Sequence, residues 1–128
     1  MSRPATSRRR PLSREPLKAM RVSPSFHDFV VDQLSAVKGL RTRAMFGGVG
    51  IYAEDVFFAL VARDELYLKV DDSNRDDYAA AGGRPFQPYE HQAMTMSYYS
   101  VPAPILEDPE ALMRWARRSL ALARTRHK

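Results

Sequence analysis

The spacing of apolar residues between positions 41 and 70 constrains the fold of this chain more than any other feature. Apolar side chains recur at every second position there, so that Phe58, Leu60 and Ala62 share one face of an extended segment, as in a β-strand. The intervening residues are apolar too, which indicates a strand buried on both faces. Charged residues at 54–55 and 63–65 separate the apolar runs, and such short connections favour antiparallel hairpins. The pattern predicts an antiparallel meander.

Helical spacing precedes the meander. Apolar side chains lie three and four positions apart from Phe26 to Val37, which places one apolar stripe along a helix. Ser23 is a suitable N-cap because its hydroxyl can accept a hydrogen bond from an unpaired backbone N–H. Gly39 is expected to end the helix, since glycine readily adopts positive φ.

Two helices and a strand are predicted after the meander. A short helix runs from residue 71 or 72 to about residue 81, where two glycines follow, and both ends have suitable caps. Alternation at residues 94–99 predicts another strand. The last helix starts at residues 107–110, where acidic side chains suit the positive end of the helix dipole, and its apolar side includes Trp115.

The chain has 128 residues, which is the size of one globular domain. Residues 1–21 carry a net charge of +6, whereas residues 22–128 carry −1. The first segment lacks apolar periodicity and is predicted to be a disordered basic tail, and residues 22–128 are predicted to form the domain. Met20 is an alternative initiator, in which case residues 1–19 are not translated. The net positive charge of the chain therefore comes from the tail.

The absence of cysteine excludes disulfides, thiolate metal sites and a cysteine nucleophile. No apolar run reaches the ~20 residues that a membrane helix needs. The arginines that follow Ser7 lack the apolar segment of an export signal. These features predict a cytoplasmic protein.

Several short motifs resemble functional sites but lack the residues that define them. The glycines at 47–50 precede a strand rather than a helix, so we expect a bend in a sheet and not a phosphate loop. The string from Ser35 to Lys38 lacks the companion motifs of penicillin-recognising enzymes, and residues 72–83 lack the glycine and glutamate of a calcium loop. No histidine has a ligand or triad partner at a suitable spacing. We expect no catalytic residues, no cofactor and no metal.

The strand predicted at residues 94–99 carries side chains that suit a partner surface. Met94, Met96 and Tyr98 alternate with a second set that ends in Tyr99. Such a set usually belongs to a core, but adaptable sulfur and amphipathic tyrosine also suit a protein interface. The candidate partner surface is therefore Tyr98 and Tyr99.

Seven blocks of sequence follow one another in a fixed order and at consistent separations along most of the chain. They are Met45 to Tyr52, Phe57 to Val61, Leu66 to Asp72, Asn74-Arg75, Pro85-Phe86, Met96 to Tyr99, and Leu106 to Pro109 with Trp115 to Arg118. Together they resemble the N-terminal domain of the TfoX/Sxy family of competence regulators, over about residues 22 to 123.

This resemblance implies an α+β fold of two layers, in which helices pack on one face of an antiparallel sheet in the order α-β3-α-β2-α. It also implies regulation of DNA-uptake genes alongside a transcription factor, and it brings no catalytic residues to this chain. The family's full-length regulators have a second, C-terminal helical domain, which the sequence up to Lys128 does not contain. We therefore expect a stand-alone domain of this kind.

Three functions follow as hypotheses, and the oligomeric state stays open. The first is a non-enzymatic regulatory or adaptor domain that binds an unidentified protein. The second is weak, sequence-insensitive association with nucleic acid through positive charge. The third is an enzyme whose catalytic residues the motifs do not reveal. The candidate nucleic-acid contacts are the arginines of the tail and of the last helix: Arg8, Arg9, Arg10, Arg114, Arg117, Arg118 and Arg124.

Overall fold

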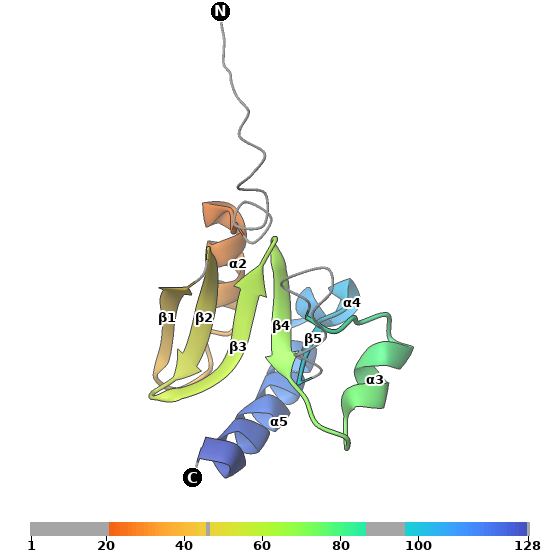
Figure 1. The fold of residues 1–128 in the computed structure, drawn as a ribbon. Helices are drawn as coiled ribbons and strands as arrows, with labels where there is room; N and C mark the ends of the chain where they lie inside the picture. The colour runs from red at the N-terminus through yellow and green to blue at the C-terminus, as the bar shows by residue number, and fades with distance from the viewer. Residues whose placement is uncertain (1–20, 46, 87–96, 128) are drawn as a thin grey trace, which may run out of the picture.

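The structure of the chain, a computed structural model, describes residues 21–45, 47–86 and 97–127. A five-stranded sheet forms one layer and helices form the other (Figure 1). The elements in chain order are α2 (Pro24–Gln33), β1 (Leu40–Met45), β2 (Gly48–Ala53), β3 (Val56–Ala62), β4 (Glu65–Lys69), α3 (Arg75–Ala80), β5 (Tyr98–Ser100), α4 (Ala103–Leu106) and α5 (Pro109–His127).

The sheet is an antiparallel meander in which the strands lie in chain order, from β1 to β5. The connection between β3 and β4 shows why the turns are short. It consists of Arg63 and Asp64, whose φ angles are +54° and +57°. A two-residue hairpin of type I′ requires positive φ at both positions, because only that geometry matches the twist of the strands. The predicted meander is therefore confirmed.

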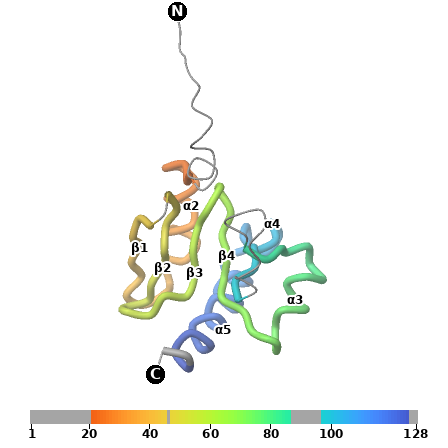
Figure 2. The backbone as a smooth tube through the Cα atoms, viewed as in Figure 1, coloured from red at the N-terminus to blue at the C-terminus, as the bar shows by residue number. Residues whose placement is uncertain are grey.

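The main core lies between one face of the sheet and the helices α2 and α5 behind it (Figure 2). From the sheet, Ile51 and Leu68 are buried in it, and Leu34 and Leu112 meet them from the helical layer. These four side chains are at most 1% exposed. Burial of each aliphatic side chain of this size contributes about 1.5 to 3 kcal/mol to stability.

A β-bulge interrupts the register between β2 and β3. Tyr52 pairs with Phe57, whereas the preceding residue, Ile51, pairs with Ala59. Phe58 is the extra residue on β3, as in a bulge where two residues oppose one. Phe58 is fully buried in the main core. The bulge thus places Phe58 on the core face together with Ala59, whereas Leu60 and Ala62 pack in a second cluster on the other face. The prediction that Phe58, Leu60 and Ala62 share one face is therefore wrong for Phe58, because the extra residue shifts the alternation.

The expected class, an α+β fold with an antiparallel sheet, is confirmed. The expected order of elements is not confirmed, because four strands and not three lie between α2 and α3, and the described residues between α3 and α5 hold one strand, β5, and a further helix, α4. The edge strand β1 was hidden from apolar spacing by its exposed polar residues at 41–43, which are typical of sheet edges. Of the strand predicted at residues 94–99, Met94 and Met96 lie outside the described residues.

The first helix is shorter than predicted. The Ser23 hydroxyl accepts a hydrogen bond from the backbone N–H of Phe26 at 3.2 Å, as expected of an N-cap. The helix ends at Gln33 rather than near Gly39. Val37 is nevertheless buried in the core, because the chain turns back toward the sheet directly after the helix. Periodicity therefore correctly identified Val30, Leu34 and Val37 as buried. It was wrong for Phe29, which is exposed, and for the helix end.

Candidate functional site

Helix α5 presents four of the candidate arginines on one side. Arg114 lies three residues before Arg117 and four before Arg118, and Arg124 lies seven residues after Arg117, so all four fall within about a third of the helix circumference. All four are exposed. The helix therefore offers one band of cations, as expected from the sequence. The candidate contacts of the tail, Arg8, Arg9 and Arg10, lie outside the described residues.

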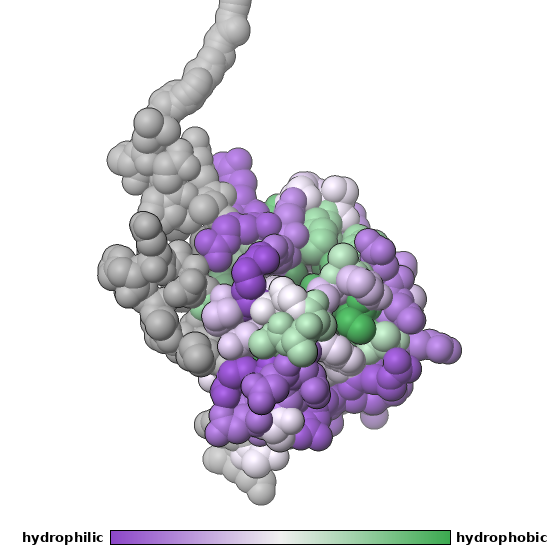
Figure 3. All heavy atoms as spheres, turned by 90° about the vertical axis from the view of Figure 1, so that its right-hand side faces the viewer, coloured by the Kyte–Doolittle hydropathy of each residue, from purple (hydrophilic) through white to green (hydrophobic). Residues whose placement is uncertain are grey.

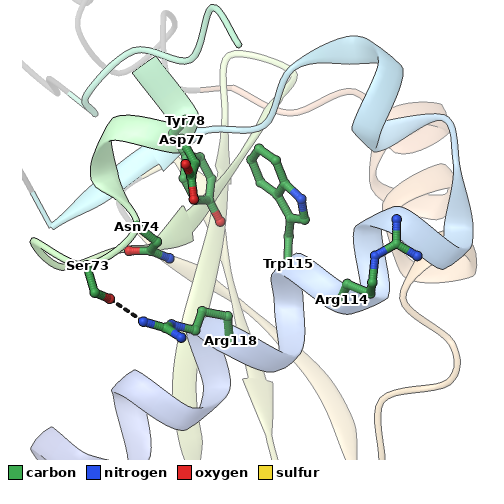
Figure 4. A pocket seen from close by; sticks show the side chains of 7 residues that line it. All are labelled: Ser73, Asn74, Asp77, Tyr78, Arg114, Trp115 and Arg118. Carbon is green, nitrogen blue, oxygen red and sulfur yellow. Dashed lines mark hydrogen bonds between the residues drawn. The ribbon is translucent and has the colours of Figure 1, made fainter. Parts of the chain in front are cut away.

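A pocket of about 240 Å³ lies between α3 and α5. It belongs to the side of the molecule that carries α3, where hydrophilic side chains surround a smaller apolar area (Figure 3). Figure 4 shows the side chains of the lining residues. They are Ser73, Asn74, Asp77, Tyr78, Arg114, Trp115 and Arg118.

The loop before α3 provides the polar wall of the pocket. Asp71 Oδ1 accepts hydrogen bonds from the backbone N–H of Ser73 at 2.8 Å and from its hydroxyl at 2.5 Å. These bonds lower the pKa of Asp71, and the charges of Arg118 and Arg75 lower it further. Asn74 Oδ1 accepts the backbone N–H of Asp71 at 2.9 Å, which leaves its amide nitrogen pointing toward the pocket (Figure 4).

This loop also displaces the predicted start of the short helix. The helix begins at Arg75, with Asn74 as its N-cap, and not at residue 71 or 72. The side chain of Asp71 is already bonded within the turn that precedes the helix, so it does not cap the first helical turn. An aspartate followed by serine and asparagine favours such a local turn over immediate helix formation.

Tyr78 and Trp115 form the aromatic wall. Their rings meet edge to face, with centroids 4.4 Å apart and an interplanar angle of 61°, a favourable aromatic geometry. Tyr78 is 2% exposed, and within the described part of the chain its hydroxyl has no hydrogen-bond partner. Burial raises the pKa of Tyr78, and the nearby Ser119 hydroxyl opposes that shift. Trp115, expected on the buried side of α5, is only partly buried because it borders the pocket.

Two arginines and one aspartate bring charge to the pocket. The guanidinium of Arg118 reaches across from α5 and donates to the Ser73 hydroxyl, whereas Arg114 extends away along the helix (Figure 4). The Ser73 hydroxyl in turn donates to Asp71, so one chain of hydrogen bonds links α5 to the loop before α3. Asp77 is exposed and also borders the pocket.

Aromatic side chains also lie on the face of the sheet opposite the main core. The ring centroids of Tyr52 and Phe57 are 5.2 Å apart, and those of Phe57 and Tyr98 are 5.7 Å apart. Lys69 places its ammonium 4.9 Å from the centroid of the Tyr98 ring. Tyr52, Phe57, Leu60 and Tyr98 are all half-buried. We call these four residues the open-face cluster.

The two tyrosines expected to form a partner surface lie on opposite faces of β5. Tyr98 belongs to the open-face cluster, and burial raises its pKa to about 12, with a smaller contribution from Tyr52. Tyr99 is 7% exposed and packs in the main core, 6.3 Å from the Tyr78 ring. The prediction for Tyr99 as a surface residue is therefore wrong, because consecutive residues of a strand point to opposite faces.

Two kinds of site have no counterpart in the described residues. No three histidine or acidic side chains there gather closely enough to hold a metal ion. The helices in residues 21–45, 47–86 and 97–127 include none whose length and apolar character would let it cross a membrane.

The family of the chain is given by its sequence as a whole. The family model described as TfoX N-terminal domain matches residues 32–123, from the end of α2 into α5, and the match includes every strand of the sheet. A search of curated proteins finds no match. Because the family model covers most of the chain, the protein belongs to the TfoX N-terminal domain family.

Proposed function

We propose that the chain is a non-enzymatic regulatory domain of the cytoplasm that acts by binding another protein. The observation that carries this proposal is the open-face cluster. In a sheet with helices on one side, the other side usually carries polar residues. Here β2, β3 and β5 place Tyr52, Phe57, Leu60 and Tyr98 on that side instead. Aromatic side chains on a surface favour protein contacts.

Positive charges beside the open-face cluster indicate the chemistry of the partner. On the edge strand β1, Arg41 lies opposite Tyr52 and Arg43 lies opposite Gly50, so both share the face of the cluster. The Arg41 guanidinium donates a hydrogen bond to Asp55 Oδ1 at 3.1 Å, and both side chains are exposed. An exposed ion pair of this kind contributes little to stability. These cations favour a partner that presents an apolar contact with acidic residues around it.

Family membership agrees with a regulatory role. The likeness to competence regulators supports a transcription factor as the protein partner. This chain contains the N-terminal domain of that family across most of its length. We infer that the domain supplies a contact surface to a regulatory complex rather than a chemical step.

Nucleic-acid binding is the weaker candidate function. Residues 22–128 carry a net charge of −1, so the exposed arginines of α5 belong to a domain without net positive charge. Phosphate contacts alone give binding that is salt-sensitive and insensitive to sequence. We expect such binding to be incidental.

Photo-crosslinking from the open face tests the proposal. We replace Tyr52 with p-benzoylphenylalanine, which keeps an aromatic ring there, and irradiate native lysate treated with nuclease. We expect a discrete protein adduct, and we expect Arg43→Glu to reduce its yield roughly fivefold or more, since reversed charge at an interface rim weakens association.

Phe29 on α2 provides the matched control, because it is an aromatic residue 38% exposed to solvent and lies outside the open-face cluster. The same probe at Phe29 should not give this adduct. An adduct that forms equally from Phe29, or that is unaffected by Arg43→Glu, would contradict the proposal.

A further inference from the structure

The geometry points to the pocket between α3 and α5 as a binding site for a small ligand that carries an oxyanion, a phosphate or a carboxylate, on a flat apolar group. The site is independent of the open-face cluster. Three hydrogen-bond donors and an aromatic wall meet there, from two elements that are far apart in the sequence.

The donors come from Tyr78, Asn74 and Arg118. Figure 4 shows the Tyr78 hydroxyl directed into the pocket, with the Asn74 amide nitrogen on one side and Arg118 below. Asn74 is 8% exposed, and its carbonyl oxygen is already used by the backbone of Asp71. Arg118 uses one of its five N–H groups on Ser73. Converging N–H and O–H donors suit an acceptor, and a guanidinium makes a negatively charged one preferable.

The hydroxyl of Tyr78 is the clearest sign of a missing ligand. A buried hydroxyl without a partner costs about 1 to 3 kcal/mol of stability, and such groups are rare in folded proteins. Tyr78 Oη is the one buried side-chain polar atom without a partner in the described residues. The Ser119 hydroxyl, which opposes the rise in the pKa of Tyr78, donates its own proton to the Lys69 carbonyl at 2.8 Å. An oxyanion in the pocket would accept a hydrogen bond from the Tyr78 hydroxyl, for which the described residues provide no acceptor.

The aromatic wall and the volume limit the ligand further. Trp115 and Tyr78 line one side of the pocket, so a flat apolar group can stack beside the oxyanion. The volume of about 240 Å³ is below the ~300 to 1,000 Å³ of pockets for drug-sized ligands. A small metabolite fits these limits better than a length of polymer.

Asp77 opposes the binding of a negatively charged ligand. Its carboxylate borders the pocket and is exposed, so it repels an anion through solvent that screens part of the effect. We therefore expect Asp77→Asn to tighten binding of an oxyanion by about twofold to threefold.

The only tryptophan of the chain makes binding directly measurable. Because Trp115 lines the pocket, its fluorescence reports on ligands added to the full chain at constant ionic strength. The probes are phenyl phosphate and benzoate, with inorganic phosphate and phenol as fragments that lack the ring or the charge. We expect saturable changes with at least one of the two aromatic anions, and binding at least about tenfold weaker for each fragment, since each loses one set of contacts.

Single substitutions distinguish binding in the pocket from non-specific attraction of anions to positive charge. Arg118→Gln should weaken binding about tenfold or more, whereas Arg117→Gln, an exposed arginine outside the pocket, should leave it unchanged. Tyr78→Phe should weaken binding about fivefold and leave the unfolding midpoint unchanged or higher, because it removes an unpartnered buried hydroxyl.

Four results would overturn the inference. They are a change in fluorescence that does not saturate with either aromatic anion, equal binding of phenol, equal weakening by Arg117→Gln and Arg118→Gln, or a lower unfolding midpoint for Tyr78→Phe. None of these results bears on the protein contact at the open face, because the two sites share no residue.

Discussion

Replacing Phe58 with alanine is expected to lower the free energy of unfolding by about 3 to 5 kcal/mol, the range for a large aromatic side chain removed from a core. Phe58 is fully buried in the main core at the bulge of β3. A bulge holds its extra residue in a local geometry, so the neighbouring strands have little freedom to close the cavity. Urea denaturation followed by circular dichroism measures the loss.

Phe57 is the matched control, because it is the same residue type one position earlier and lies half-buried on the opposite face. Phe57→Ala should cost only about 1 to 2 kcal/mol, since less apolar area is removed from contact. If Phe57 proved the costlier of the two positions, the assignment of faces around the bulge would be wrong.

Gly83→Ala is expected to cost about 3 kcal/mol, at the upper end of the range for overpacking. A Cβ atom at this position would lie 2.6 Å from the carbonyl oxygen of Ser100 and 2.9 Å from that of Tyr78. Both contacts are with backbone, which cannot rotate away as a side chain can. The Gly83 N–H also donates to the Tyr78 carbonyl at 2.7 Å, so the glycine fixes the end of α3 against β5.

Gly82 separates this clash from the loss of glycine flexibility. Its φ is +97° and an added Cβ would meet no atom within 4 Å, so Gly82→Ala should cost only about 1 kcal/mol, from backbone strain alone. Thermal or urea unfolding of both variants gives the comparison. A larger loss for Gly82→Ala than for Gly83→Ala would show that φ, and not close packing, decides this helix end.

The sequence predicted those parts of the fold that depend on neighbouring residues. Alternation revealed the meander, and one of the two glycines at 82–83 was expected to adopt positive φ, as Gly82 does. The bulge at Phe58 was not predictable in this way, because both faces of β3 are apolar and the alternation is the same in either register. Consequently Phe58 was assigned to the face of Leu60 and Ala62, whereas it lies in the main core with Ala59.

The candidate pocket was missed for a different reason. Arg118 and Trp115 were assigned to opposite sides of α5, and Tyr78 stood out in no pattern. Ser73 and Arg118 are 45 residues apart, so their contact depends on how α3 packs beside α5, which no local spacing specifies. The sequence did show that Trp115 is the only tryptophan, and that fact acquires meaning only from the pocket around it.

Binding of the full chain to two unrelated DNA duplexes tests most directly whether the domain acts through protein rather than through nucleic acid. Fluorescence anisotropy gives the dissociation constants over a series of salt concentrations. We predict equal constants within about twofold on the two duplexes and a steep loss of affinity with salt, because phosphate contacts carry no sequence information. A ratio of ~10³ or more between the duplexes at about 0.15 M salt, the scale of specific recognition, would contradict the proposed function.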